Sequence, residues 1–287
     1  MHPKNHQCSA RPPLRWIAAL FSIVTLPFRW IIGPGTPAEE YRKLCRLDAW
    51  HPSLFTEAQK HPHRNRFSDV LPNESTRFKL ASDPNFYFNA NWVLDKQAIA
   101  CQGPLETEIN QFWQMVWHAD VKTIAMLANP VELGRNKCSE YWKSSFSSRL
   151  FAALSVQCIS ETTVFEKDKV KIVERTIRLT KAGKTKEVTQ YHLQNWPDFG
   201  VVEPEALAKL VTLIDSKQAP FLAHCNAGIG RTGTFLAAYQ AYKQKTSQIY
   251  NIAAALRNPQ KGRMGMIQTA EQYALARETA QLLARSS

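Results

Sequence analysis

Apolar residues recur at helical spacing in two segments of the chain. Residues 104–120 (PLETEINQFWQMVWHAD) and 204–215 (PEALAKLVTLID) each place large apolar side chains on one face. The second segment has a proline in its first turn, a position that proline favours. The residues on these two faces are Leu105, Ile109, Phe112, Trp113, Val116 and Trp117, and then Leu207, Leu210, Val211 and Ile214. We predict a helix in each segment and a final helix that starts near Thr269.

Shorter apolar runs predict strands between the helices. Two further segments flank the polar turn KAGKTK and predict an antiparallel hairpin. The single strands are expected at residues 86–94, 123–129 and 219–224, and the hairpin strands at 170–180 and 187–196. No internal repeat interrupts this order. The mixture predicts an α/β fold: a single domain with a twisted mixed sheet flanked by helices on both faces.

The first 38 residues differ from the rest, because they carry four basic residues and no acidic one. Residues 16–28 (WIAALFSIVTLPF) are uncharged and strongly apolar, but they are too few for a typical transmembrane helix. We expect residues 1–38 to be a separate basic, apolar segment that ends in a linker, and residues 39–287 to be the folded domain. The leader has three interpretations: membrane association through residues 11–32, a secretion or chaperone-binding signal, or a helix packed on the domain.

Composition narrows the class of protein. The hydrophobic fraction of 44% supports a sizeable core, and six cysteines without CxxC or zinc-like spacing suggest free thiols in a reducing compartment. The net charge of +12 favours an anionic partner such as a phosphorylated protein, a nucleic acid or an acidic membrane. No run of lysine and arginine with interleaved aromatics occurs, so we do not expect nucleic-acid binding.

The segment HCNAGIGRTG, residues 224–233, carries the strongest chemical signal. It joins the expected strand 219–224 to an expected helix, 232–244, and a glycine-rich loop before a helix N-terminus is a phosphate-binding arrangement. The thiol of Cys225 at such a position, beside Arg231, is favoured as a thiolate nucleophile. Arg231 has the planar fork that binds two phosphate oxygens, and Thr232 is placed to donate its hydroxyl to the sulfur. We therefore expect phosphoryl transfer to Cys225 without a metal or other cofactor.

A second segment, NWPDFG, adds an acid. Asp198 follows a proline and the bulky Trp196, so its carboxyl group lies on a turn and is a candidate general acid for a leaving oxygen. Taken alone, this segment indicates little more than a turn. Beside the cysteine loop, it supports acid catalysis.

These motifs together resemble the phosphotyrosine-specific protein-tyrosine phosphatases, over about residues 40 to 285. The resemblance rests on seven segments in the family's order. They are RNRFSDVLP, FYFNANWV, QGPLETEINQFWQMVW, KCSEYW, NWPDFG, HCNAGIGRTGT and GMIQTAEQY.

The resemblance implies a role for each matching residue. Cys225 would be the nucleophile, Arg231 the phosphate clamp, and Asp198 the acid of the first step and the base of the second. Gln268 would position the attacking water. The residues implied to bind or support substrate are Asn226, Ala227, Gly228, Ile229, Gly230, Gln272, Phe67, Asp69, Glu132 (paired with Arg231), Trp196 (in loop closure) and His224 (behind the thiolate). Gln272 also fits a helix capping box, and His224 also fits an ordinary core position.

The chain departs from the family pattern in places. Phe67 stands where a tyrosine is usual, which keeps the aromatic face and loses the hydroxyl, and Arg64 stands where a lysine is usual. The function implied is hydrolysis of phosphotyrosine in proteins, with the catalytic domain in a reducing cytosol, at a membrane or after export into another cell. The alternatives are a dual-specificity or phosphoinositide phosphatase and a non-catalytic phosphotyrosine-binding module.

Overall fold

The computed structural model describes residues 35–48, 50–143, 154–217 and 220–286. The leader expected to bind a membrane or direct export, residues 11–32, lies outside the described residues. Within the described ranges, none of the helices combines the length and the apolar character needed to cross a membrane.

A seven-stranded mixed sheet forms the centre of the fold, in the order β1-β2-β9-β3-β8-β7-β6. The four central strands β2, β9, β3 and β8 are parallel. At one edge β1 pairs antiparallel with β2, and at the other edge β8 pairs antiparallel with β7, which pairs antiparallel with β6. The strands are β1 (Ala90–Val93), β2 (Ala98–Cys101), β3 (Thr123–Met126), β6 (Leu154–Lys167), β7 (Val170–Lys181), β8 (Lys184–Gln194) and β9 (Phe221–His224). A separate small hairpin consists of β4 (Val131–Glu132) and β5 (Arg135–Asn136).

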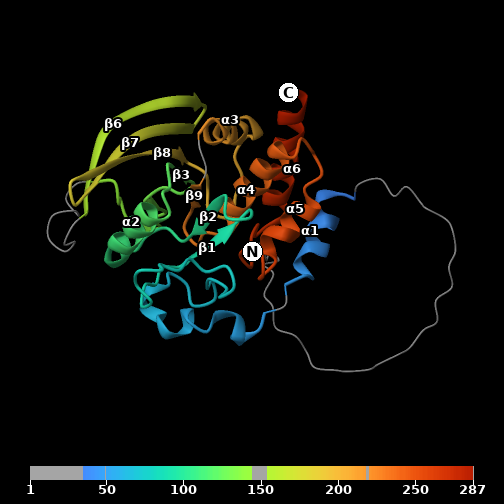
Figure 1. Cartoon of the computed structure of the whole chain (residues 1–287). Helices are drawn as coiled ribbons and strands as arrows, with labels where there is room; N and C mark the ends of the chain where they lie inside the picture. Colours follow the sequence, from blue (N-terminus) through green and yellow to red (C-terminus); the bar gives the residue numbers. More distant parts are fainter. Residues whose placement is uncertain (1–34, 49, 144–153, 218–219, 287) are drawn as a thin grey trace.

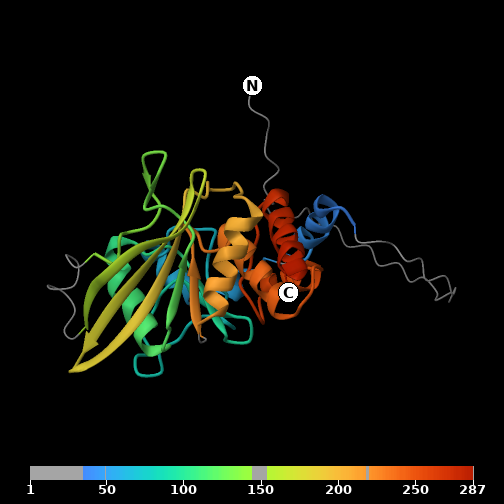
Figure 2. The same ribbon diagram turned by 90° about the horizontal axis from the view of Figure 1, so that it is seen from above.

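Helices cover both faces of the sheet, with α2 on one side and α3 to α6 on the other (Figures 1 and 2). The helices are α1 (Pro37–Cys45), α2 (Ile109–His118), α3 (Pro204–Asp215), α4 (Gly230–Lys243), α5 (Tyr250–Arg257) and α6 (Ala270–Ser286). Short 3₁₀ turns lie at Pro52–Phe55, Ala58–Lys60, Pro62–Arg64 and Glu106–Glu108. The expected single α/β domain with a mixed sheet and helices on both faces is confirmed.

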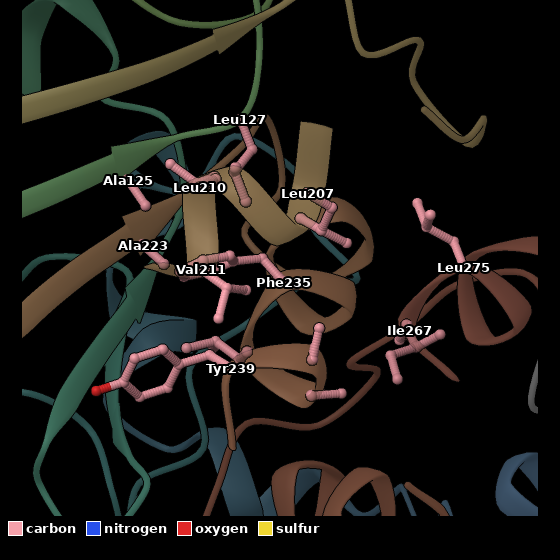
Figure 3. Close-up of a cluster of buried hydrophobic side chains, with 14 of the residues drawn as sticks. Ala125, Leu127, Leu207, Leu210, Val211, Ala223, Phe235, Tyr239, Ile267 and Leu275 are labelled. Carbon is pink, nitrogen blue, oxygen red and sulfur yellow. The ribbon is translucent and has the colours of Figure 1, made fainter. Parts of the chain in front are cut away.

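The larger core lies between α3, α4, α6 and the parallel strands. In Figure 3, Leu210 and Val211 of α3 point toward Ala125 and Ala223 of the central strands, beside Phe235 of α4. All five side chains are fully buried. Small alanines on the strands allow these helices to pack close to the sheet, which holds the loop between β9 and α4 in a fixed position.

Most predicted elements are present, with shifted bounds. Helix α3 has the predicted bounds, and the hairpin of β7 and β8 is antiparallel as predicted. The strand expected at 86–94 forms only over Ala90–Val93, because Phe86, Tyr87 and Phe88 are buried in the core without pairing in the sheet. Strands β2, β4, β5 and β6 and helices α1 and α5 were not predicted. Strand β6 is largely exposed, so its sequence lacks a clear apolar pattern.

The cysteines differ in part from expectation. Cys101, Cys138, Cys158 and Cys225 are free thiols. Cys45 is disulfide-bonded, so the expectation of free thiols throughout is wrong at this residue. Pairing depends on which distant segments meet in space, and sequence spacing alone does not show this.

Candidate active site

The loop between β9 and α4 places Cys225 at the carboxyl end of a central parallel strand. β9 ends at His224, α4 begins at Gly230, and Cys225 is only 3% exposed. The backbone N–H of Gly228 donates to the Cys225 sulfur at 3.3 Å. Gly228 has φ +77°, and a Cβ there would overlap the backbone carbonyl of Cys101 on β2. Glycine is therefore required for the loop to turn an amide toward the sulfur.

Arg231 lies in the first turn of α4, and its buried guanidinium contacts the segments that carry Glu132 and Asp198. Its Nη1 donates to Glu132 Oε1 at 2.6 Å and to the Trp196 carbonyl at 2.7 Å, and its Nη2 donates to Asp198 Oδ1 at 3.1 Å. Burial alone would lower the pKa of Arg231, but the charges of Cys225, Glu132 and Asp198 outweigh it and raise that pKa. The structure thus contains the ion pair of Glu132 with Arg231 that the sequence motif implied.

Asp198 lies between two cations. Besides Arg231, Lys137 Nζ contacts its Oδ2 at 2.8 Å, and Asn226 Nδ2 donates to the same oxygen at 3.3 Å. Burial raises the pKa of Asp198, but Arg231, Lys137 and Asn226 outweigh burial, so the net pKa is lowered. These contacts favour the carboxylate form of Asp198, the candidate acid.

Sequence reasoning missed Lys137. It follows β5 of the small hairpin that also carries Glu132, so this hairpin supplies one partner to Arg231 and one to Asp198. The signal was present in the segment VELGRNKC, where a cation stands five residues after the acid. The contact itself depends on the hairpin turning toward the loop that bears Asp198.

His224 is fully buried behind Cys225 and connects the loop to the core. Gln190 donates to the hydroxyl of Tyr141 at 2.8 Å, which directs that hydroxyl to donate to His224 Nε2 at 2.7 Å. His224 Nδ1 is then the protonated nitrogen and donates to the Cys225 carbonyl at 3.2 Å. Burial lowers the pKa of His224 to about 4, so its ring is neutral at pH 7. His224 therefore contacts the Cys225 backbone through a neutral ring, and its partner Tyr141 was not identified from sequence.

Gln268 and Gln272 lie beside the cysteine loop. The Ile267 N–H donates to the Ile229 carbonyl at 3.0 Å, and a Cβ on Gly230 would overlap the Gln268 side chain. Gln268 N–H donates to Gln272 Oε1 at 2.9 Å. Gln272 Nε2 is buried and has no hydrogen-bond partner within the described residues. The two glutamines thus lie beside the cysteine loop, and the water-positioning role that the resemblance implies for them stays a prediction.

The start of α6 explains part of the role of Gln272. Its N–H donates to Thr269 Oγ1 at 3.1 Å, which is one half of the expected capping box. Its side chain reaches Gln268 rather than the Thr269 backbone. Tyr41 of α1 also donates to the Gln268 carbonyl, at 2.5 Å. A helix far away in the sequence therefore helps to hold Gln268, which the sequence did not predict.

Phe67 and Asp69 are exposed on the segment after the third 3₁₀ turn. No contact joins either of them to Cys225 among the described residues, but the neighbouring Arg66 ties this segment to the site. Arg66 donates to the carbonyls of Gly103 and Pro104, and the Gly103 N–H donates to the Asn226 carbonyl at 2.9 Å. Arg66 thus connects the segment that carries Phe67 to the backbone beside the cysteine loop, and the substrate-binding roles of Phe67 and Asp69 stay predictions.

Two buried side chains complete the surroundings of the loop. Arg263 donates to Asn89, Asn91 and the Ala227 carbonyl, and burial lowers its pKa to about 10. Sequence reasoning missed this support. The Thr232 hydroxyl has no hydrogen-bond partner within the described residues, so its expected bond to the sulfur is not formed here. Across the same residues, no group of three His, Cys, Asp or Glu side chains is placed to hold a metal ion.

Comparisons with known proteins identify the family and the fold. Residues 61–281 match the family model described as protein-tyrosine phosphatase. The human receptor-type tyrosine-protein phosphatase eta is 34% identical over 254 residues, which cover 82% of this chain and 18% of that protein. Human tyrosine-protein phosphatase non-receptor type 2 is 32% identical over 269 residues, covering 83% of this chain and 63% of that protein. The chain thus matches less than a fifth of the length of the first relative.

The fold also has solved counterparts. The structure described as PTPN18 in complex with HER2-pY1248 phosphor-peptides matches with a TM-score of 0.75 and 25% identity. The match covers 86% of this chain and 99% of the other.

Proposed function

Because this chain belongs to the protein-tyrosine phosphatase family, we propose that it hydrolyses phosphotyrosine in proteins through a cysteinyl-phosphate intermediate. The observation that carries the proposal is the meeting of three groups at one point. The Gly228 amide donates to the sulfur of Cys225, the charge of Cys225 raises the pKa of Arg231, and Asp198 contacts the Arg231 guanidinium. A nucleophile, an anion clamp and a proton donor are what this reaction requires.

In the first step, the thiolate of Cys225 attacks phosphorus while the bond from phosphorus to the tyrosine oxygen breaks. The protonated carboxyl group of Asp198 gives its proton to the departing oxygen, which leaves as the neutral phenol of tyrosine. Arg231 and the loop amides from Asn226 to Arg231 stabilise the charge on the remaining phosphate oxygens. The product of this step is a cysteinyl-phosphate.

The contacts of Asp198 couple proton uptake to substrate binding. A phosphate bound by Arg231 replaces the carboxylate that now contacts its Nη2. Losing that cation and gaining a neighbouring anion both raise the pKa of Asp198, which favours the protonated acid. The carbonyl of Trp196 accepts from Arg231, so phosphate binding to Arg231 also acts on the loop that bears Asp198.

In the second step, water attacks phosphorus and the sulfur–phosphorus bond breaks. Asp198, now a carboxylate, accepts a proton from the water, and inorganic phosphate and the Cys225 thiolate are released. Gln268 positions the water, with Gln272 supporting it. Thr232, whose hydroxyl is free of other described contacts, is available to donate to the thiolate as it reforms.

Selectivity for phosphotyrosine rests on Phe67 and Asp69. The exposed ring of Phe67 offers a face for a phosphotyrosine ring, and Asp69 offers a carboxylate for peptide N–H groups. The related PTPN18 structure is described as a complex with HER2 phosphor-peptides, which supports peptide substrates. Dual-specificity, phosphoinositide and purely binding functions remain the alternatives that the assay must separate.

We further propose that residues 39–287 form the catalytic domain and that residues 1–38 act outside it. The family match over 61–281 and the contacts of Glu40 on α1 with Tyr273 and Arg277 on α6 support this division. The domain would act in a reducing cytosol, with residues 11–32 directing it to a membrane surface or to export. Thr36 caps α1, so a truncated chain should begin at Gly35. Equal partitioning of full-length and truncated protein into vesicles would refute membrane association.

The experiment that tests the function measures phosphate release from matched phosphotyrosine, phosphoserine and phosphothreonine peptides. Cys225→Ser is the blank, and the reaction is run with and without reductant. We expect release from the phosphotyrosine peptide alone, with reductant and with Cys225 present. Tight binding without release would indicate a capture module, and equal release from all three peptides would indicate a shallower, less selective pocket.

A further inference from the structure

An open cavity of about 460 Å³ lies outside the candidate active site. It is bounded by residues 75–79, by the turn between β1 and β2, and by residues 260–261. Its lining residues are Ser75, Thr76, Arg77, Lys79, Trp92, Asp95, Lys96, Gln260 and Lys261. None of these residues takes part in the proposed reaction, and the volume falls within the range of about 300–1,000 Å³ usual for ligand sites. We call this cavity the basic pocket.

The basic pocket and Cys225 are at opposite ends of the sheet. β2 and β9 are parallel, with Ala98 opposite Phe221 and Cys101 opposite His224. The pocket residue Lys96 precedes β2, whereas Cys225 follows β9. The four-residue strands alone separate the two sites by roughly 13 Å. A single phosphorylated side chain cannot occupy both sites.

The lining is cationic with one aromatic wall. Arg77 and Lys79 share the carboxylate of Glu74, at 3.0 and 2.8 Å. Lys96 and Lys261 form no ion pair with any described residue, and Asp95 is the one carboxylate in the lining beside four cationic side chains. Trp92 packs on Phe78, with ring centroids 5.8 Å apart, and presents a half-buried indole to the cavity. The cationic side chains attract a phosphoryl group, and Trp92 offers an apolar surface to the side chain that carries the phosphoryl group.

The turn that bears Lys96 has an unusual backbone. Leu94, Asp95 and Lys96 have φ values of +53°, +51° and +65°. Non-glycine residues adopt this left-handed conformation rarely and usually singly, and strained residues concentrate at functional sites. The strained turn holds Asp95 and Lys96 at the rim of the pocket, where Asp95 can accept from peptide N–H groups.

A chain of hydrogen bonds leads from the basic pocket to the cysteine loop. Asn91 Nδ2 donates to Oγ1 of the lining residue Thr76 at 2.9 Å. Arg263 donates to Asn91 Oδ1 at 2.9 Å and to the Ala227 carbonyl at 3.1 Å. Two side chains therefore separate the pocket from the loop that surrounds the Cys225 sulfur.

We propose that the basic pocket binds a phosphorylated segment of a protein substrate, at a residue distant from the phosphotyrosine that is cleaved. The proposal rests on the proposed function, because it assumes phosphoprotein substrates. Lys96 and Lys261 bind the phosphoryl group, Trp92 packs on the carrying side chain, and Asp95 accepts from the backbone. The open cavity lets the peptide chain enter and leave, and the net charge of +12 favours the approach of an acidic segment.

The test measures binding with the active site blocked. Full-length protein is saturated with orthovanadate, and loss of p-nitrophenyl phosphate hydrolysis confirms the block. Fluorescence anisotropy then follows a short fluorescein-labelled phosphoserine peptide and its unphosphorylated twin. The variant is Lys96→Glu with Lys261→Glu, and the matched control is Lys184→Glu with Lys209→Glu, which reverses two exposed charges elsewhere.

We expect the pocket variant to weaken binding of the phosphopeptide about tenfold, because two attractive charges become repulsive, and the control to change it less than about twofold. Both variants should keep unblocked p-nitrophenyl phosphate activity. Equal effects of the two pairs, or equal binding of both peptides, would overturn the proposal. If the blocked protein binds inorganic pyrophosphate, measured by calorimetry, but does not bind the phosphopeptide, the pocket holds a free anion and not a segment of a protein, and the proposal is overturned. A wild-type chain that hydrolyses no phosphate ester would instead refute the proposed function, and the binding comparison would still decide on the pocket.

Discussion

Replacing Asp198 with asparagine removes the proposed acid and keeps the shape of the side chain. In the structure, Asp198 also occupies Arg231 Nη2 at 3.1 Å, where a phosphate oxygen would bind. The substitution should therefore have two opposite effects. Turnover should fall, because no proton reaches the leaving oxygen, and anion binding should tighten, because a competing carboxylate is lost.

Both magnitudes follow from the site. A positioned general acid contributes about 10²–10⁴-fold, so kcat for an aryl phosphate with a weakly acidic phenol should fall by that factor. The attraction of Asp198 Oδ1 for Arg231 is about 5 kcal/mol at an effective dielectric constant of 20 and this distance. Most of that is offset by lost hydration, because the Asp198 side chain is only 22% exposed. A net gain of about 1.4 kcal/mol would tighten binding of orthovanadate about tenfold.

Steady-state kinetics on phenyl phosphate and p-nitrophenyl phosphate, with orthovanadate inhibition, would measure both effects. The loss in kcat/KM, which reports the first step and not the hydrolysis of the cysteinyl-phosphate, should be smaller for p-nitrophenyl phosphate, whose leaving group needs less protonation. Asp120→Asn, at an exposed carboxylate paired with two lysines, is the control and should change neither quantity. Weaker orthovanadate binding, or equal losses of kcat/KM on both substrates, would refute the assignment of Asp198 as the acid.

Lys137 provides a second, linked test. Its contact lowers the pKa of Asp198, so Lys137→Met should raise that pKa and move the basic limb of the profile of kcat/KM against pH to higher pH. In the Asp198→Asn background the same substitution should leave the profile unchanged. A shift that persists in the double variant would show that Lys137 acts on another group.

The remaining predictions concern positioning and stability. Tyr41→Phe removes the hydrogen bond to the Gln268 carbonyl and should slow hydrolysis of the cysteinyl-phosphate up to about tenfold, seen as a larger p-nitrophenol burst with an unchanged first step. Burial lowers the pKa of His192 to about 3 and of His224 to about 4, below the ordinary value of 6.5. Below pH 6.5 the unfolded chain takes up protons on these rings and the folded chain does not, so the free energy of unfolding is greatest above pH 6.5 and falls as the pH falls. Urea unfolding at pH 7.5 and 5 should show a loss of about 2 kcal/mol for each ring, and equal stabilities would contradict this. Gly228→Ala should abolish activity and destabilise the fold by about 3 kcal/mol or more in thermal unfolding, because the new Cβ overlaps a backbone carbonyl at φ +77°.

Much of the site was predictable because its signals are local in the chain. Cys225 and Arg231 stand six residues apart in one loop, and the loop, its strand and its helix are adjacent in sequence. Helix α3 was equally predictable, because a single apolar face at helical spacing is enough to specify it. Strand β6 was not, because it is stabilised by pairing with β7 rather than by an apolar pattern of its own.

The order of motifs and the local periodicity determined the family and most of the fold, and they singled out Cys225 as the proposed nucleophile. Only the tertiary structure decided which groups hold the catalytic residues: Lys137 on Asp198, Tyr41 on Gln268, and Arg263 on the cysteine loop. The last two contacts join segments 227 and 36 residues apart. A hydrogen bond or an ion pair acts over about 3 Å, so its partners are set by how the chain crosses itself in space. No local pattern of residues carries that information.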